Sequence, residues 1–160
     1  MAKPTKRQSD TPTVLNRKAR HNYLIEETFE VGVALVGSEV KSIRDGQVSI
    51  AEGFVRVEED PPGLFLHGVH IMQYAPAAGR QHPPARVRRL LAHKREIRKL
   101  AALVKQKGVT IVPLKLYFSH GWAKVEIGVA RGKRQSDKRQ ALKTREARRD
   151  IDRAMSKKVR

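Results

Sequence analysis

The first clear pattern along the chain is a strict alternation of hydrophobic and polar residues. Apolar side chains occupy every second position from 29 to 35, which predicts a strand with one buried face. Apolar runs at 54–57 and 64–67 predict a hairpin around an Asp-Pro-Pro-Gly turn. Runs at 110–118 and 122–130 predict a second hairpin around Ser-His-Gly.

Two segments have helical spacing instead. Ser38 is expected to cap a short helix that ends near Gly46. Apolar residues from 87 to 104 recur at helical intervals and predict the longest helix of the patterned region. On this spacing Leu91 belongs to the apolar face of that helix, whereas Arg88 lies on its cationic face.

Together these elements favour a mainly β fold with some α: a small OB-like β-barrel with helices packed outside. Residues 1–14 are rich in Lys, Pro, Thr and Ser and are expected to be a disordered N-terminal segment. Residues 15–132 form the predicted barrel domain. Residues 133–160 hold few large apolar residues and cannot bury enough area to offset their ordering entropy. This basic tail is therefore expected to be disordered in isolation and to fold on contact with RNA.

The distribution of charge is more informative than the formal total of +18. Residues 1–22 carry a net +5, residues 80–107 a net +9 and residues 131–160 another +9, whereas residues 23–79 carry a net −6. A positive charge that is concentrated in separate segments suits a phosphate backbone, so a nucleic acid is the first candidate partner.

Enzyme and metal chemistry find little support. The chain contains no cysteine, which excludes disulfides, zinc fingers and thiol catalysis. Phosphate-binding-loop, nucleophile-elbow and zinc-protease motifs are absent from the sequence. His67 and His70 point to opposite faces of a predicted strand and cannot readily share an ion. Because no apolar run approaches the roughly 18 residues of a membrane span, we expect a cytoplasmic, non-enzymatic protein without a cofactor or membrane contact.

The aromatic content bears on the kind of nucleic acid that is recognised. The chain has one Trp, three Tyr and four Phe, most of them at predicted core positions of strands. A protein that reads single-stranded sequence would stack bases on exposed rings. We therefore expect recognition of a folded RNA by shape, through phosphates and 2′-hydroxyls. DNA stays open on charge alone, although no helix-turn-helix spacing is present.

Six strings of residues, in order along the chain, resemble the SmpB (SsrA-binding protein) family. They are Leu15–Tyr23, Ile25–Gly32, Gly37–Arg44, Leu90–Glu96, Val112–Tyr117 and Gly132–Arg139. Six ordered motifs are far more specific than any single one. Two positions depart from the family pattern: Arg134 stands where the family usually has Lys, and Gly68 replaces a commoner polar residue.

The resemblance implies an OB-like barrel that binds the tRNA-like domain of transfer-messenger RNA (tmRNA, or SsrA RNA). It further implies that the complex enters ribosomes stalled on broken messages for trans-translation, with the tail, helical on ribosome binding, in the 16S rRNA decoding centre and the message channel. Elongation factor Tu would be reached through the RNA. Because no apolar self-association patch is evident, we expect a monomer.

The resemblance also implies two sets of site residues. The RNA-contacting set is Asn16, Arg17, Lys18, Arg20, His21, Glu30, Leu91 and Lys124. The ribosome-directed set is Gly132, Lys133, Arg134, Asp137, Lys138, Arg139, Ile151 and Met155.

Physical chemistry supports these residues unequally. Lys124 and Asn16 are natural RNA ligands, whereas Glu30 repels phosphate and either accepts from a base amino group, orients an Arg or is simply solvated. Asp137 is a candidate cap of a tail helix. The alternatives to the rescue function are a ribosomal protein, a general RNA-binding chaperone or a DNA-compacting protein.

Overall fold

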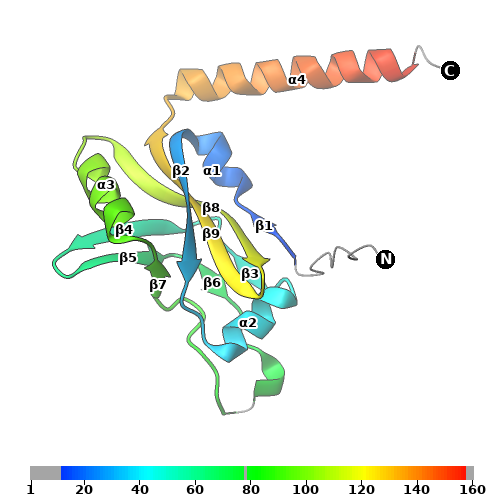
Figure 1. The fold of residues 1–160 in the computed structure, drawn as a ribbon. Helices are drawn as coiled ribbons and strands as arrows, with labels where there is room; N and C mark the ends of the chain where they lie inside the picture. Colours follow the sequence, from blue (N-terminus) through cyan, green and yellow to red (C-terminus); the bar gives the residue numbers. More distant parts are fainter. Residues whose placement is uncertain (1–11, 78, 158–160) are drawn as a thin grey trace, which may run out of the picture.

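The strands of the molecule coil into a ring (Figure 1), in a computed structural model that describes residues 12–77 and 79–157. In chain order the strands are β1 (Val14–Leu15), β2 (Tyr23–Val33), β3 (Val48–Ser49), β4 (Phe54–Glu59), β5 (Pro62–His67), β6 (His70–Ile71), β7 (Arg88–Leu91), β8 (Val109–Ser119) and β9 (Trp122–Gly132). The helices are α1 (Arg17–Asn22), α2 (Gly37–Arg44), the 3-10 turn η1 (Ala75–Ala77), α3 (Lys94–Val104) and α4 (Gln135–Lys157).

The main sheet has the strand order β1-β8-β4-β5-β7-β2-β9, and β8 also pairs with β9. This second pairing returns the sheet to its own start, so the strands enclose a core, with β1 added at one side. The narrowest join is β4 to β8, where Val55 pairs with Ile111. The fold confirms the predicted OB-like barrel.

The alternation seen in the sequence explains most of the strands. Along β2, Val31 and Val33 are buried while Glu30 and Thr28 are exposed. The predicted hairpins are both present, as β4–β5 and β8–β9. The interior is apolar, and α3 places Leu100 in it while packing against β4, β5 and β8 (Figure 1).

The predicted helix from 87 to 104 is wrong in its first part. Arg88–Leu91 is β7, a strand that pairs with β5 and β2, and the helix begins only at Lys94. The side chain of Glu96 accepts a hydrogen bond from the His93 N–H at 2.9 Å, which fixes this start. A short apolar run fits both periods, and pairing with distant strands decides between them.

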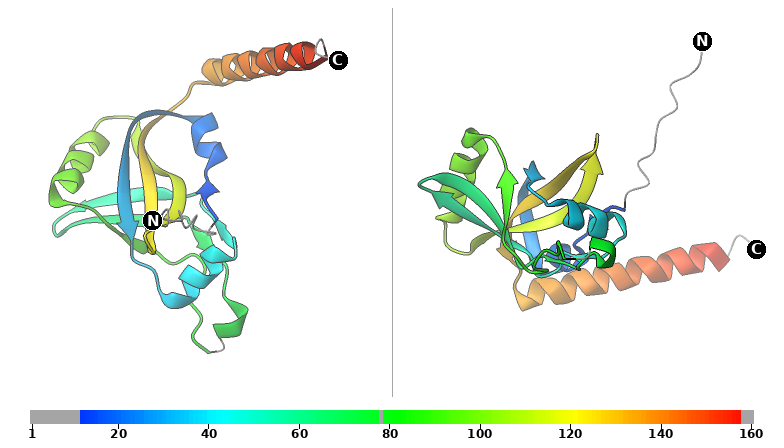
Figure 2. Two further views of the ribbon diagram at one scale, coloured as in Figure 1. Left: turned by 45° about the vertical axis from the view of Figure 1, so that its right-hand side comes forward. Right: turned by 90° about the horizontal axis from the view of Figure 1, so that it is seen from below.

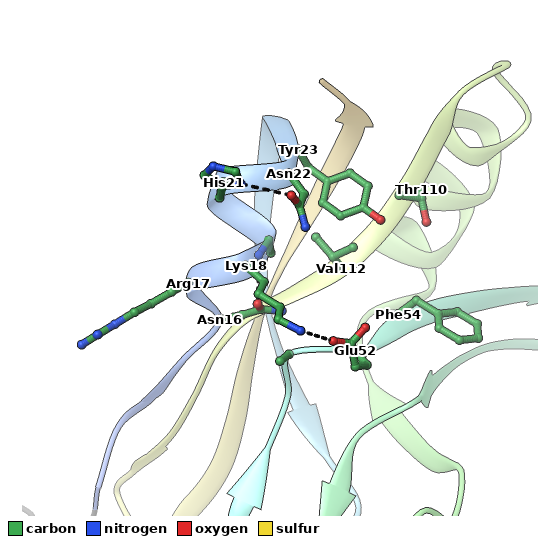
Figure 3. A pocket seen from close by; sticks show the side chains of 13 residues that line it. Asn16, Arg17, Lys18, His21, Asn22, Tyr23, Glu52, Phe54, Thr110 and Val112 are labelled. Atoms are coloured by element: carbon green, nitrogen blue, oxygen red, sulfur yellow. Dashed lines mark hydrogen bonds and ion pairs between the residues drawn. The ribbon is translucent and has the colours of Figure 1, made fainter. Parts of the chain in front are cut away.

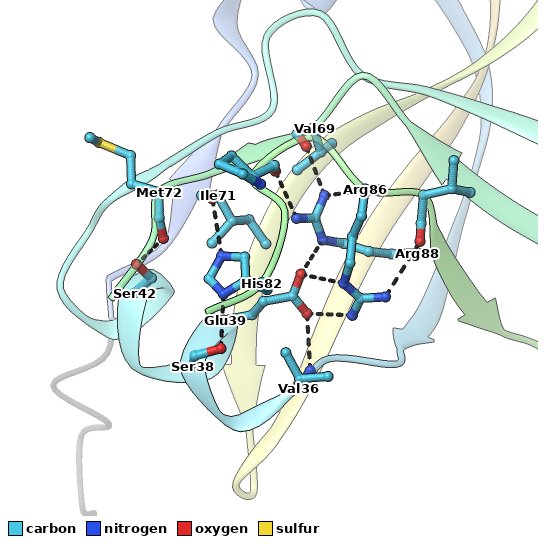
Figure 4. A network of polar contacts seen from close by, with 12 residues as sticks. Val36, Ser38, Glu39, Ser42, Val69, Ile71, Met72, His82, Arg86 and Arg88 are labelled. Carbon is cyan, nitrogen blue, oxygen red and sulfur yellow. Dashed lines mark hydrogen bonds and ion pairs between the residues drawn. The ribbon is translucent and has the colours of Figure 1, made fainter. Parts of the chain in front are cut away.

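Arg88, predicted to face solvent, is fully buried in an ionic network (Figure 4). Its Nε donates to Glu39 Oε1 at 2.8 Å, and Arg86 Nη2 donates to Glu39 Oε2 at 2.5 Å. Burial would raise the pKa of Glu39, but the hydrogen bonds from Arg86 and the Val36 N–H outweigh it and lower that pKa. The network holds α2 against the segment that leads into β7.

Ser38 does not cap α2, contrary to the prediction. The capping position is Val36, whose N–H donates to the Glu39 carboxylate at 3.0 Å. Ser38 lies in the first turn, and its hydroxyl is 2.9 Å from Nδ1 of the buried His82 (Figure 4). The start of α2 is therefore fixed by the Glu39 carboxylate and not by the Ser38 hydroxyl.

The two ends of the chain differ from the barrel. Val14, the last residue of the segment that was predicted to be disordered, pairs with Leu116 in β1. Residues 1–11 of that segment lie outside the described part. At the other end α4 projects beyond the ring (Figures 1 and 2), and its described side chains are exposed. Disorder of the free tail stays a prediction.

Candidate nucleic-acid interface

Helix α1 is held on the barrel by Asn16. The Asn16 Oδ1 accepts from the Ala19 N–H at 2.9 Å, and its Nδ2 donates to the carbonyls of Ile50 and Pro113, each at 2.9 Å. Asn16 is 3% exposed, and its amide is fully used inside the protein. The expectation that Asn16 is a direct RNA ligand is therefore corrected: it positions α1.

The fixed helix presents four polar side chains to solvent: Arg17, Lys18, Arg20 and His21. Lys18 forms a 2.5 Å ion pair with Glu52, and Arg20 lies 4.0 Å from Glu126. Both cations are more than half exposed, so these pairs contribute little to stability and leave the charges accessible. The exposed cations give this surface the charge of a phosphate-binding site.

A pocket of about 560 Å³ lies between α1 and the starts of β2 and β4 (Figure 3). Lys18 and Glu52 form an ion pair at its wall, and His21 Nδ1 lies 3.1 Å from Asn22 Oδ1 at its edge. Because an amide oxygen only accepts, the Nδ1 of His21 carries the proton in this contact. The α1 cations thus border a concave site.

A second surface follows from the strand register. Leu91 of β7 pairs with Gly32 of β2, Gly32 pairs with Lys124 of β9, and Lys124 pairs with Tyr117 of β8. These residues form one row across four strands, which we call the Leu91–Tyr117 row. A Cβ on Gly32 would lie 3.3 Å from the Leu91 Cβ, so glycine leaves room for the leucine.

Leu91 is 56% exposed, so its interpretation as a core residue of a helix is wrong. It lies at an alternating position of β7, opposite in direction to the buried Leu90. An exposed leucine in a row that also holds a lysine and a tyrosine is available to a partner. This placement leaves the RNA contact implied by the resemblance open.

Glu30 lies beside this row and is not a lone solvated carboxylate. It accepts hydrogen bonds from the Lys124 ammonium and from the Tyr117 hydroxyl. The Lys124 bond, followed by the Tyr117 bond, lowers the pKa of Glu30. Burial and the bond to Glu30 raise the pKa of Tyr117 to about 12, so its hydroxyl keeps its proton. Glu30 therefore orients Lys124 on this surface.

The ribosome-directed residues begin where β9 ends at Gly132. The Lys133 N–H donates to the Asn22 carbonyl at 2.9 Å, and Lys133 Nζ donates to the Arg20 carbonyl at 3.2 Å. Arg134 is exposed and links this anchor to α4. The base of the tail is therefore attached to α1.

Within α4, Asp137 lies in the first turn and not at the cap, so the capping prediction is wrong; its charge still suits the helix dipole. Lys138 and Arg139 follow it in the same helix. Ile151 and Met155 are 57% and 66% exposed and one helical turn apart. The tail thus presents apolar side chains that nothing in the described protein covers.

Sequence reasoning missed the aromatic part of the surface. Only Phe118 of the aromatic residues is buried, whereas Phe54 is 45% and Trp122 is 75% exposed. The expectation that most rings lie in the core overlooked these two, which occupy outward positions at the first residues of β4 and β9. Their position at the first residue of a predicted strand was the sequence feature that could have indicated their exposure.

Within the described residues, no helix is long and apolar enough to cross a membrane. The same part of the chain contains no cluster of three or more potential metal-ligating side chains.

The geometry can be compared with known proteins. A family model described as SmpB protein matches residues 13–157. The chain belongs to the SmpB family. An SsrA-binding protein of Lactiplantibacillus plantarum is 50% identical over 155 residues, which cover 97% of this chain and 98% of that relative. Another from Geobacillus thermodenitrificans is 51% identical over 139 residues, covering 87% and 88%.

A solved structure resembles this SmpB-family chain as well. It is described as "tmRNA-SmpB: a journey to the center of the bacterial ribosome". Its matching chain is 46% identical with a TM-score of 0.66, and the match covers 82% of this chain and 95% of that one. The similarity therefore includes the strand order and not only the sequence motifs.

Proposed function

We propose that this protein binds the tRNA-like domain of tmRNA and delivers the RNA to stalled ribosomes for trans-translation, which frees the ribosome and tags the incomplete protein. The observation that carries the proposal is the 50% identity along 97% of the chain to an SsrA-binding protein. The exposed cations of α1 and the Leu91–Tyr117 row supply surfaces for a folded polyanion.

The barrel and the tail have separate tasks in this proposal. Residues 15–132 hold the tRNA-like domain, with Arg17, Lys18, Arg20 and His21 at phosphates and Lys124 and Leu91 at a second contact. Asn16 and Glu30 position these ligands. Residues 133–160, from the Gly132–Arg139 motif to Ile151 and Met155, enter the 16S rRNA decoding centre and the message channel.

The remaining features of the proposal follow from the same role. The protein acts in the bacterial cytoplasm as a monomer, without catalysis or cofactor, and meets elongation factor Tu through the RNA. Its contribution is shape and charge: a preformed cationic surface increases the affinity for RNA through release of counterions.

The nucleic acid retained by a tagged full-length protein at moderate salt tests this function. We expect one dominant RNA with a tRNA-like end. Stoichiometric ribosomal RNA would instead support a ribosomal protein, mixed RNAs a general chaperone, and DNA a compaction role. A reconstituted translation system stalled on a message without a stop codon provides the second test, in which tagging should require both the protein and tmRNA.

A further inference from the structure

The pocket between α1 and β4 contains an exposed aromatic ring. Phe54 is 45% exposed and lines the pocket, although it lies at the start of a strand whose next residue is buried. Its ring is stacked on His67, with centroids 5.1 Å apart and planes at 11°. The stack holds the ring at a fixed angle, and a ring held in this way is a stacking platform for a flat ligand.

A second ring lies across the pocket. Figure 3 shows Tyr23 and Thr110 toward one end of the pocket and Phe54 and Glu52 toward the other. Tyr23 packs against the small apolar cluster beneath α1, which fixes its position. The pocket volume of about 560 Å³ lies in the range of small-molecule sites and is sufficient for one nucleotide.

The polar groups around the pocket match the edge of a base. Glu52 offers two carboxylate oxygens, which only accept, and its side chain is 74% exposed. Guanine presents two neighbouring donors on its pairing edge, N1–H and N2–H, which suit a carboxylate. Asn22, whose Oδ1 is engaged by His21, has its Nδ2 hydrogens left to donate to a base oxygen or nitrogen.

The backbone around Glu52 is fixed by a glycine. Gly68 has a φ of +67°, and a Cβ there would lie 2.4 Å from the Glu52 carbonyl oxygen. Any other residue would collide with this backbone in a conformation that L residues rarely adopt, so the local structure requires glycine at position 68. The backbone that carries Glu52 is thereby fixed at the wall of the pocket, while its exposed carboxylate is free to turn.

Cations border the same pocket, so a base would enter with its phosphate already attracted. Lys18 is paired with Glu52 at 2.5 Å, but this pair is exposed and worth little. Lys18 can therefore turn to a phosphate as Glu52 turns to the base. Arg17 is also among the lining residues, but in Figure 3 its side chain points away from Tyr23, Glu52 and Phe54.

We propose that this pocket binds one unstacked nucleobase of the RNA, a guanine by preference, with Phe54 stacking on the base, Glu52 accepting from its pairing edge and Lys18 contacting its phosphate. The inference rests on the proposed function, because it assigns a base-reading site to the same RNA complex. Recognition is then partly by an extruded base and not by shape alone.

A double-mutant cycle tests the pocket. The probes are tRNA-like fragments of tmRNA in which each single-stranded nucleotide in turn lacks its base, bound to the full-length protein at fixed salt. Phe54→Leu should weaken binding of the intact fragment about tenfold, the loss expected for one stacked base. At one position, removal of the base should lower the affinity of the wild type for the fragment about tenfold. The affinity of Phe54→Leu should not change when the same base is removed.

Two variants make the result specific. Phe54→Trp keeps a stacking ring and should retain the wild-type affinity. Trp122→Leu removes a ring that is more exposed but lies outside the pocket. Removal of the base should therefore lower the affinity of Trp122→Leu by the same factor as it lowers the affinity of the wild type. Circular dichroism and thermal melting check that each variant is folded.

Replacement of the coupled guanine by inosine removes the N2 amino group and tests Glu52. The replacement should lower the RNA affinity of the wild type about tenfold and leave that of Glu52→Gln almost unchanged. The Gln amide cannot accept from both N1–H and N2–H of guanine, so it loses little when N2 is removed. Equal losses in both proteins would overturn the assignment of guanine.

The pocket and the function fail in different ways. If the wild type prefers the tRNA-like fragment but no position is coupled to Phe54, the pocket does not hold a base and the inference is wrong. If the wild type prefers another RNA, the proposed function falls, and the same cycle on that RNA still decides the pocket.

Discussion

The barrel and α4 both carry excess positive charge, yet the charges have different surroundings. Cations of the barrel lie next to acids from distant segments, as in Lys18–Glu52, Lys105–Glu59 and Arg131–Glu26. Among the described residues of α4, the one ion pair is Arg153–Asp150 at 3.9 Å, within a single turn. The positions of the barrel charges are thus set by tertiary structure, whereas those of α4 depend on the helix alone.

This difference indicates how each region meets RNA. A surface fixed by tertiary contacts exists before the partner arrives and loses little entropy on binding. A single exposed helix is marginal in water, so its order depends on what it binds. The following predictions test this contrast, from the largest expected effect to the smallest.

Truncation after Gly132 separates the two regions most directly. Tagging of stalled chains in a reconstituted system should fall to background. The melting temperature of the barrel and its affinity for the tRNA-like fragment should stay mostly intact, because the described side chains of α4 contribute nothing to the buried core. Ala147→Pro, in the middle of α4, is the matched variant in the full-length chain. Continued tagging by the truncated protein would contradict the division of labour.

Glu39→Ala should cause the largest loss of stability, about 3–5 kcal/mol in urea unfolding, since it leaves Arg88 buried and unpaired. Glu59→Ala removes an exposed partner of Lys105 and should cost only about 0–1 kcal/mol. Similar losses of unfolding free energy in the two variants would show that burial does not determine how much these ion pairs stabilise the protein.

Lys124→Ala tests a barrel cation that is already paired. RNA affinity should fall, and the slope of log affinity against log salt should become shallower by about one unit at most, since Glu30 neutralises part of the charge. Lys105→Ala, an exposed cation also paired with an acid, is the control. An unchanged slope and affinity for Lys124→Ala would remove this residue from the interface.

The smallest effect concerns the carboxyl of Glu30. An NMR titration should give a pKa below its ordinary value of 4.5, and Lys124→Ala should raise it, because the lysine hydrogen bond is the largest cause of the lowering. With a lowered pKa in the folded state, the stabilisation is present above the unfolded value and is lost as the pH falls through the folded pKa. An unchanged pKa in the variant would refute the pairing.

Local patterns predicted the parts of the fold that depend on neighbours in sequence. The β8–β9 hairpin was predictable because each strand alternates and the turn residues lie between them. β7 was not, since Leu90 and Leu91 fit a helix equally well until pairing with β2 and β5 is known.

The candidate site shows the same limit. The cations of α1 were predictable from charge, and their exposure agrees with that prediction. The burial of Asn16 depends on Ile50 and Pro113, which are far along the chain, so no local pattern signals it. The pocket with Phe54 is likewise made by segments that only the fold brings together.

Because Lys133 is hydrogen-bonded to α1, a rotation at the base of α4 is transmitted to its far end. Its 23 helical residues extend about 35 Å at a rise of about 1.5 Å each. A rotation of about 10° at the root would move the far end by about 6 Å, more than one helical turn. A small displacement of α1 on RNA binding would therefore become a larger displacement at the far end of α4. The two hydrogen bonds of Lys133 thus couple RNA binding at α1 to the position of the end of the tail.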